Sequence, residues 1–241
     1  MRIGVICEGY PIPQKKAKIA LIGKIGAVEV YVTSVEKCEG KRRFLRRVRK
    51  CAAELKRAGI SLCVGEESFL PVRAFGIELF FDDTRILKTK AAAAAREFAA
   101  VTAQNVDFLI TGGSAADLIK TACELLKFRK TVYVGHPSFE EIADVLFSET
   151  GASVRRDVPE NVISVNLGSG EFISYEDFFA DSGDFRVRFS ENLLKELSES
   201  DLRRLASLLE ISGFLRENEI KVEYSPKKIS KFTNLLLDNS T

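Results

Sequence analysis

The pattern of apolar and polar positions along the chain predicts short buried strands that alternate with amphipathic helices. Between positions 41 and 58, apolar residues recur at three- and four-residue steps, which is typical of a helix with one buried face. Short apolar runs at 3–7, 60–64 and 77–81 are the length of strands that lie inside a sheet. Because strands of this kind followed by helices favour parallel sheets with right-handed crossovers, we predict an α/β fold.

The second half of the chain shows the same alternation more clearly. We expect strands at 106–111, 131–134 and 161–167, with helices at 115–127 and 138–149 between them. Helices that separate consecutive strands are the connections that parallel strands require. This part of the chain is therefore predicted to form a Rossmann-like parallel sheet flanked by helices.

The two groups of strands and helices suggest two lobes. A run of five alanines at 91–95 predicts a helix between them, since alanine has the best intrinsic helix propensity. The expected division is an N-terminal α/β lobe at 1–88, a connecting helix at 89–104, a Rossmann-like domain at 105–190, and C-terminal helices with a polar tail at 191–241.

Composition and charge narrow the class of protein. Hydrophobic residues make up 46% of the chain and charged residues 29%, which is ordinary for a globular protein. The formal net charge is +2, so any attraction to a polyanion must come from a local patch. No apolar stretch reaches the roughly 18 residues of a membrane helix, and the N-terminus does not have the pattern of a signal peptide. The five cysteines lie mostly within apolar patterns, and we expect a cytoplasmic protein that does not contact the membrane.

The segment Gly112-Gly113-Ser114 follows a predicted strand and precedes a predicted helix. In an open parallel sheet, ligands bind beyond the carboxyl ends of the strands, where helix N-termini present N–H groups. Glycine has no Cβ, so its backbone can approach a phosphate closely. We expect these three residues to bind a nucleotide-type ligand. The competing interpretation is that Ser114 and Asp117 only cap the following helix.

The stretch from Val106 to Ser169 resembles the NAD(P)-binding domain of the shikimate dehydrogenase and glutamyl-tRNA reductase families. The shared order is a strand, Thr-Gly-Gly-Ser-Ala-Ala, a helix, a strand that ends near His136, a second helix, a short strand, and VISVNLG. The chain also resembles bacterial Rossmann-like proteins of unassigned function that pair such a domain with an N-terminal α/β lobe. The resemblance implies a nicotinamide dinucleotide cofactor and, in the case of an enzyme, an NAD(P)-dependent oxidoreductase.

The chain departs from the family pattern G-x-G-x-x-G/A at its first position, where Thr111 stands in place of glycine. At the end of the second strand, the acidic residue that would hold a ribose hydroxyl of NAD is absent. His136-Pro137-Ser138 stands there instead, which favours NADP over NAD.

The resemblance places further residues at this cofactor. In those families, the strand that corresponds to the predicted strand at 161–167 ends near the nicotinamide. Asn166 and Gly168 lie at this strand end. The expected cofactor site therefore consists of Gly112, Gly113, Ser114, His136, Ser138, Asn166 and Gly168. No catalytic residue and no metal ligand are assigned.

Other features leave alternative functions open. The helix at 41–58 carries nine basic residues and one acid, Glu54, and such a face suits the phosphate backbone of nucleic acid. No aromatic residues interleave with its basic side to stack bases, which makes nucleic acid the less favoured partner. A non-catalytic scaffold or interaction protein, for example a homo-oligomer, is a further alternative because a fold does not fix a function. Asp82 and Asp83 are a candidate Mg²⁺ pair, with helix capping as the competing interpretation.

Overall fold

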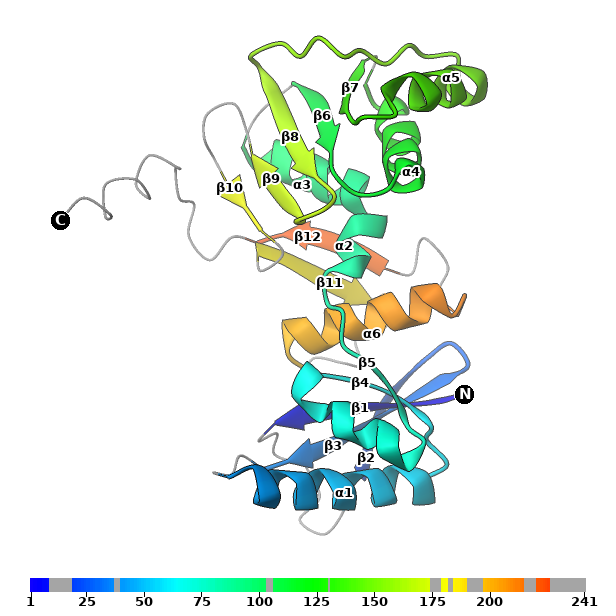
Figure 1. The fold of residues 1–241 in the computed structure, drawn as a ribbon, viewed down its shortest axis with the longest axis vertical. Helices are drawn as coiled ribbons and strands as arrows, with labels where there is room; N and C mark the ends of the chain where they lie inside the picture. Colours follow the sequence, from blue (N-terminus) through cyan, green and yellow to red (C-terminus); the bar gives the residue numbers. More distant parts are fainter. Residues whose placement is uncertain are drawn as a thin grey trace, which may run out of the picture. The chain divides into compact units, whose positions relative to one another are not determined.

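The computed structural model describes residues 1–8, 19–36, 40–102, 106–129, 131–173, 179–181, 184–189, 197–214 and 220–225. These residues form two compact units. The first unit contains Met1–Ile86 and the described part of Val187–Lys221, and the second contains Leu87–Arg186 and the described residues from Val222 onward. Each unit has parallel strands flanked by helices, which confirms the predicted α/β fold (Figure 1).

The first unit is built on a sheet with the strand order β2-β3-β1-β4-β5. Its strands are β1 (Arg2–Glu8), β2 (Ile19–Ile25), β3 (Val28–Val35), β4 (Leu62–Gly65) and β5 (Glu78–Phe80). Strand β2 forms an antiparallel hairpin with β3, and the other neighbours are parallel. The five central residues of β1 are all buried, which is why this strand reads as a continuous apolar run in the sequence.

One face of this sheet is covered by α1 (Lys41–Arg57) and by the 3₁₀ helix η1 (Glu67–Phe75). The predicted helix at 41–58 is therefore confirmed to within one residue. Its apolar residues Val48, Cys51 and Leu55 join a core cluster with β1 and β4. The cluster places the periodic apolar side of α1 against the sheet, so its basic side faces away from the core.

The opposite face is covered by α6 (Glu199–Ile211), which lies far along the chain. Leu202, Leu205 and Leu209 of α6 pack in one cluster with β-branched residues of β1 and β3. The C-terminal helix thus completes the core of the N-terminal sheet. Without it, the apolar residues on this face would be exposed to water. The part of the predicted C-terminal helices at 191–196 lies outside the described residues.

The second unit is built on a sheet with the strand order β10-β9-β8-β6-β7. Strands β6 (Asp107–Thr111), β7 (Val132–Gly135) and β8 (Val162–Asn166) are parallel. Strands β9 (Glu171–Ile173) and β10 (Phe179–Ala180) add an antiparallel edge that the apolar pattern did not predict. The short strand that the family resemblance implies before VISVNLG is reduced to one parallel bridge between Tyr133 and Arg155, on the far side of β7 from β6.

Helices flank the strands of the second sheet. The segment 89–104, expected as one connecting helix, contains the end of α2 (Arg85–Thr89) and all of α3 (Ala91–Val101), which are separated at Lys90; residues 103 and 104 lie outside the described residues. Helix α3 packs against α4 (Ala115–Leu126) and β8, and α4 packs against α5 (Phe139–Thr150). The helix expected to connect two lobes therefore has its packing partners within the second unit.

A cluster of aromatic rings fills the second unit where α3 meets β9. The centroid of the Phe172 ring lies 4.8 Å from that of Phe185, and the Phe98 centroid lies 5.2 Å from that of Tyr224. Phe185 begins β11 (Phe185–Phe189) and Tyr224 ends β12 (Ile220–Tyr224), and these two strands pair with each other. The rings come from four separate segments, so this cluster depends on the tertiary fold.

Candidate functional site

The order of the parallel strands reverses next to β6. From β6 the chain continues to β7 and then to the bridge at Arg155, which extends the sheet in one direction. It then returns to form β8 on the other side of β6. The carboxyl ends of β6 and β8 lie side by side, since Thr111 pairs in register with Asn166. In open α/β sheets, such a reversal of strand order is where ligands bind.

The glycine turn lies at this point. Gly112 and Gly113 have φ angles of 64° and 75°, a left-handed conformation that other residues rarely adopt. A Cβ atom at Gly112 would lie 2.5 Å from Oδ1 of Asn166, and one at Gly113 would lie 3.0 Å from Cβ of Leu167. The two glycines are therefore required both by the backbone conformation and by the close approach of the turn that follows β8.

Asn166 closes the turn that faces the glycines. Its side-chain Oδ1 accepts hydrogen bonds from the backbone N–H groups of Gly168, at 2.9 Å, and Ser169, at 3.2 Å. The backbone N–H of Leu167 also donates to the carbonyl oxygen of Thr111, at 2.8 Å. Leu167 is buried, whereas Gly168 and Ser169 are exposed. The structure thus brings Asn166 and Gly168 together with the glycine turn, as the predicted site requires.

Ser114 is the N-cap of α4 and forms a capping box with Asp117. The Ser114 hydroxyl donates to Oδ2 of Asp117, at 2.6 Å, and accepts from the Asp117 backbone N–H, at 3.2 Å. Gly113 and Ser114 are exposed, so a ligand has access to the corner. The carboxylate of Asp117 already lies at the positive end of the helix, and it repels a phosphate that approaches the same N–H groups.

His136 and Ser138 lie beyond the carboxyl end of β7, the other neighbour of β6. Gly135, which ends β7, pairs in register with Thr111. Nδ1 of His136 accepts a hydrogen bond from the backbone N–H of Ser138, at 3.1 Å, which leaves Nε2 as the protonated nitrogen of the neutral ring. In the described part of the chain, no hydrogen bond links these two residues to the glycine turn. They share its sheet edge and are half-buried.

The two candidate carboxylates at Asp82 and Asp83 have separate structural roles. Oδ1 of Asp82 accepts from the N–H and the hydroxyl of Thr84, both at 2.9 Å, and thereby caps the start of α2. Oδ2 of Asp83 accepts from Arg203 and from Ser200, both at 3.0 Å. Within the described ranges, no three His, Cys, Asp or Glu residues are grouped so that they could hold a metal ion.

The ion pair of Asp83 makes stability depend on pH. Partial burial raises the pKa of Asp83, but the hydrogen bonds from Arg203 and Ser200 and the positive charge of Arg203 outweigh it, so the net pKa lies below its usual value. A carboxyl group with a lowered pKa stabilises the fold above its unfolded pKa and loses this contribution as the pH falls through its folded pKa.

We therefore expect Asp83→Asn to lower the free energy of unfolding by about 1–3 kcal/mol at neutral pH. The difference from wild type should shrink as the pH falls below about 4, because Asp83 is protonated first in the unfolded chain and only at lower pH in the folded protein. Urea unfolding of the wild type and of Asp83→Asn at neutral and acidic pH measures this difference in the free energy of unfolding. A difference that stays constant across the pH range would show that the charge of Asp83 does not contribute.

The buried cysteines are not candidates for nucleophiles. Burial raises the pKa of Cys51 to about 11 and the pKa of Cys63 to about 12. Burial and the nearby Asp201 also raise the pKa of Cys7. Thiols in such surroundings stay protonated at neutral pH and behave as small apolar side chains. Cys38 lies outside the described residues.

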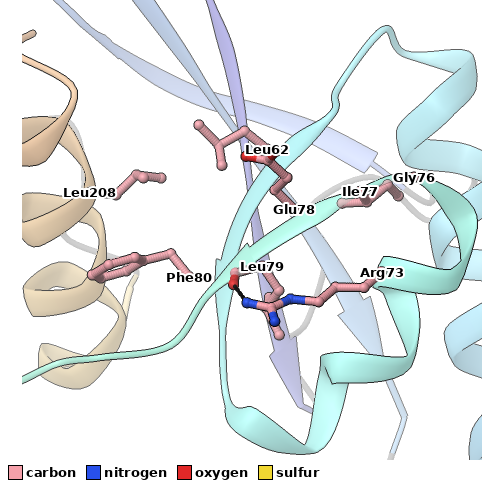
Figure 2. A pocket seen from close by; sticks show the side chains of 8 residues that line it. All are labelled: Leu62, Arg73, Gly76, Ile77, Glu78, Leu79, Phe80 and Leu208. Atoms are coloured by element: carbon pink, nitrogen blue, oxygen red, sulfur yellow. Dashed lines mark hydrogen bonds between the residues drawn. The ribbon is translucent and has the colours of Figure 1, made fainter.

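A cavity that the sequence did not reveal lies in the first unit, at the edge strand β5 (Figure 2). It has a volume of about 530 Å³ and is lined by Leu62, Arg73, Gly76, Ile77, Glu78, Leu79, Phe80 and Leu208. Arg73 donates from Nη2 to the carbonyl oxygen of Leu79, at 2.9 Å (Figure 2). This bond occupies a backbone acceptor of the edge strand and so protects the edge from pairing with another strand. No sequence signal could join Leu208 to the residues of β5.

Comparison of the chain with protein-family models, with curated proteins and with solved structures finds no match in any of the three. The helices within the described ranges are all too short or too polar to cross a membrane.

Proposed function

We propose that the second unit binds a nucleotide-type cofactor at the corner between the glycine turn and the turn at 166–168. The observation that carries this proposal is the reversal of strand order between β6 and β8, with the exposed residues Gly113 and Ser114 at that point. The order of Arg155, β7, β6 and β8 corresponds to the strand order 3-2-1-4 of a Rossmann fold, and it supports ligand binding at this corner.

NADP is the preferred cofactor of this proposal. In a Rossmann arrangement, the ribose of the adenosine lies beyond the end of the strand that follows the first helix, which is β7 here. Strand β7 ends at Gly135 and is followed by His136, Pro137 and Ser138, so the acid that would select NAD is missing. A histidine and a hydroxyl group are suited to contact the additional phosphate of NADP.

The proposal concerns binding and includes no reaction step. The chain contains a single histidine, so general acid–base chemistry by an imidazole near the corner depends on His136. An oxidoreductase would also need groups that hold its substrate, and the described residues around the corner do not define such a set.

Binding is tested by thermal denaturation with NADP, NADPH, NAD, ATP and S-adenosylmethionine. A ligand at a hundredfold excess over its Kd should stabilise the second unit by about 2.7 kcal/mol. We expect NADP and NADPH to raise the melting temperature more than NAD. If none of these ligands raises it at millimolar concentration, the corner does not bind them and the glycines serve only the turn.

Single substitutions test where the cofactor binds in the second unit. Ser138→Ala should reduce the preference for NADP over NAD, whereas Ser148→Ala, on the exposed end of the same helix, should leave it unchanged.

Asp117→Asn removes the negative charge at the start of α4 and should strengthen phosphate binding while it weakens the helix cap by about 1 kcal/mol. Weaker ligand binding by Asp117→Asn would contradict a phosphate at this helix terminus.

A further inference from the structure

The outward side of α1 forms a continuous basic surface. We define it as the basic face, and it consists of Arg42, Arg43, Arg46, Arg49 and Lys50. All five residues are exposed, whereas Val48, Cys51, Ala52 and Leu55 on the other side of the helix are buried against the sheet. In Figure 1, α1 is the outer layer on this side of the first sheet, so no described element of the first unit covers the basic face.

Among the described residues, no acidic side chain neutralises the charges of the basic face. Arg47 and Arg57, on the flanks of the same helix, form ion pairs with Glu36 and Glu54 at 2.9 and 3.1 Å. Within the described part of the chain, no residue of the basic face has an acidic partner. The guanidinium of Arg49 lies 5.8 Å from the centroid of the Phe75 ring, a contact that keeps its charge. Five positive charges are thus concentrated on one side of a protein whose formal net charge is only +2.

These charges do not stabilise the helix that carries them. The first turn of α1 contains Lys41, Arg42 and Arg43 and no acid, and its N-cap Gly40 offers no side-chain hydrogen bond. Positive charges at a helix N-terminus oppose the helix dipole, at a cost of about 0.3–1 kcal/mol each. Helices α4 and α6 have the opposite arrangement, with serine caps and acidic first turns. A polyanion bound along α1 would offset this local cost.

We propose that the basic face of α1 binds duplex DNA through its phosphates, with the helix lying in the major groove. The major groove of B-form DNA is about 12 Å wide and admits an α-helix, whereas the major groove of duplex RNA is too narrow. Arg43 and Arg49 lie on opposite flanks of the basic face and face the two walls of the groove. Contacts of this kind position a protein on DNA without reading its sequence.

The structure disfavours the other polyanions. Val48, Cys51 and Leu55 are buried in the core, and Leu45 is the one exposed large apolar residue of α1, so the helix has too little apolar surface to insert into a lipid surface. Single strands are held by aromatic residues that stack on bases, and the nearest aromatic of α1, Phe44, is half-buried and stacks on Phe69 instead.

The test is the salt dependence of binding to a labelled duplex DNA of about 20 base pairs, followed by fluorescence anisotropy. The variant changes Arg42, Arg43, Arg46 and Lys50 to glutamine, which has a similar helix propensity. The control changes Lys120, Lys127, Arg155 and Arg186 to glutamine. These four residues are exposed in the second unit, so the control removes the same number of positive charges elsewhere. Melting temperatures of both variants that are no lower than that of the wild type show that the fold is kept.

For five phosphate contacts, we expect the logarithm of the binding constant to fall with the logarithm of the salt concentration with a slope of about −4.5. The α1 variant should reduce this slope to about −1 and weaken binding at least about tenfold, whereas the control should stay within about twofold of wild type. Equal losses in variant and control would overturn the proposal. So would tighter binding to duplex RNA of the same length, or to vesicles that contain phosphatidylserine.

Discussion

Replacing Leu205 by alanine is expected to lower the free energy of unfolding of the first unit by about 2–5 kcal/mol. Leu205 lies on α6, is 0% exposed, and packs in the cluster that covers β1 and β3. Its removal leaves a cavity between a helix from the C-terminal part of the chain and the N-terminal sheet. Leu205, β1 and β3 all belong to the first of the two units, so the loss of stability should appear as faster amide hydrogen exchange of β1 and β3.

Ile211→Ala is the matched control for this experiment. Ile211 ends the same helix but is 47% exposed, so its truncation should change stability by less than about 0.5 kcal/mol. Urea unfolding and hydrogen exchange of both variants separate the effect of burial from that of helix propensity. If Leu205→Ala left the exchange of β1 and β3 unchanged, α6 would not complete the core of the first unit.

Replacing Gly112 by alanine is expected to destabilise the second unit by about 2–4 kcal/mol, for two reasons that add. The residue must adopt a φ of 64°, which is costly for any side chain with a Cβ. Its Cβ would also lie 2.5 Å from Oδ1 of Asn166, so the turn that follows β8 must move. We expect faster exchange of the backbone N–H groups of Gly168 and Ser169, which Asn166 holds.

Gly151→Ala separates the two reasons. Gly151 ends α5 with a φ of 69°, but no atom of the described structure would lie within 4 Å of a Cβ at this position. This variant should therefore lose only about 1 kcal/mol, from the backbone conformation alone. Equal losses at both positions would mean that the close approach of Asn166 to Gly112 does not constrain the turn.

The sequence predicted the helices, strands and helix cap whose formation depends on residues that are close together along the chain. The apolar period between 41 and 58 located α1, and the spacing of Ser114 and Asp117 predicted the capping box that starts α4. The short apolar runs located β1, β4 and β6, because a strand inside a sheet needs apolar residues on both faces. In each case the cause of the structure lies within a few residues, so it is visible in the sequence.

Only some of the features of the candidate site could be predicted from the sequence. Gly112 and Gly113 were recognised from their position between a strand and a helix. The reason for Gly112 proved to include Asn166, a residue of a different strand. The adjacent aspartates 82 and 83 suggest a Mg²⁺ pair, but the structure directs Asp82 to the start of α2 and Asp83 to Arg203, 120 residues away.

What the sequence determined by itself is the α/β class, most of its helices and strands, and the exposed glycine turn between a strand and a helix. Only the tertiary structure decided that α6 covers the first sheet, that β8 lies beside β6, and that β9 and β10 extend the second sheet. The physical reason is that periodicity shows which side of an element must be buried but not against which partner. The partner is selected by the apolar faces that remain open once every other element is packed.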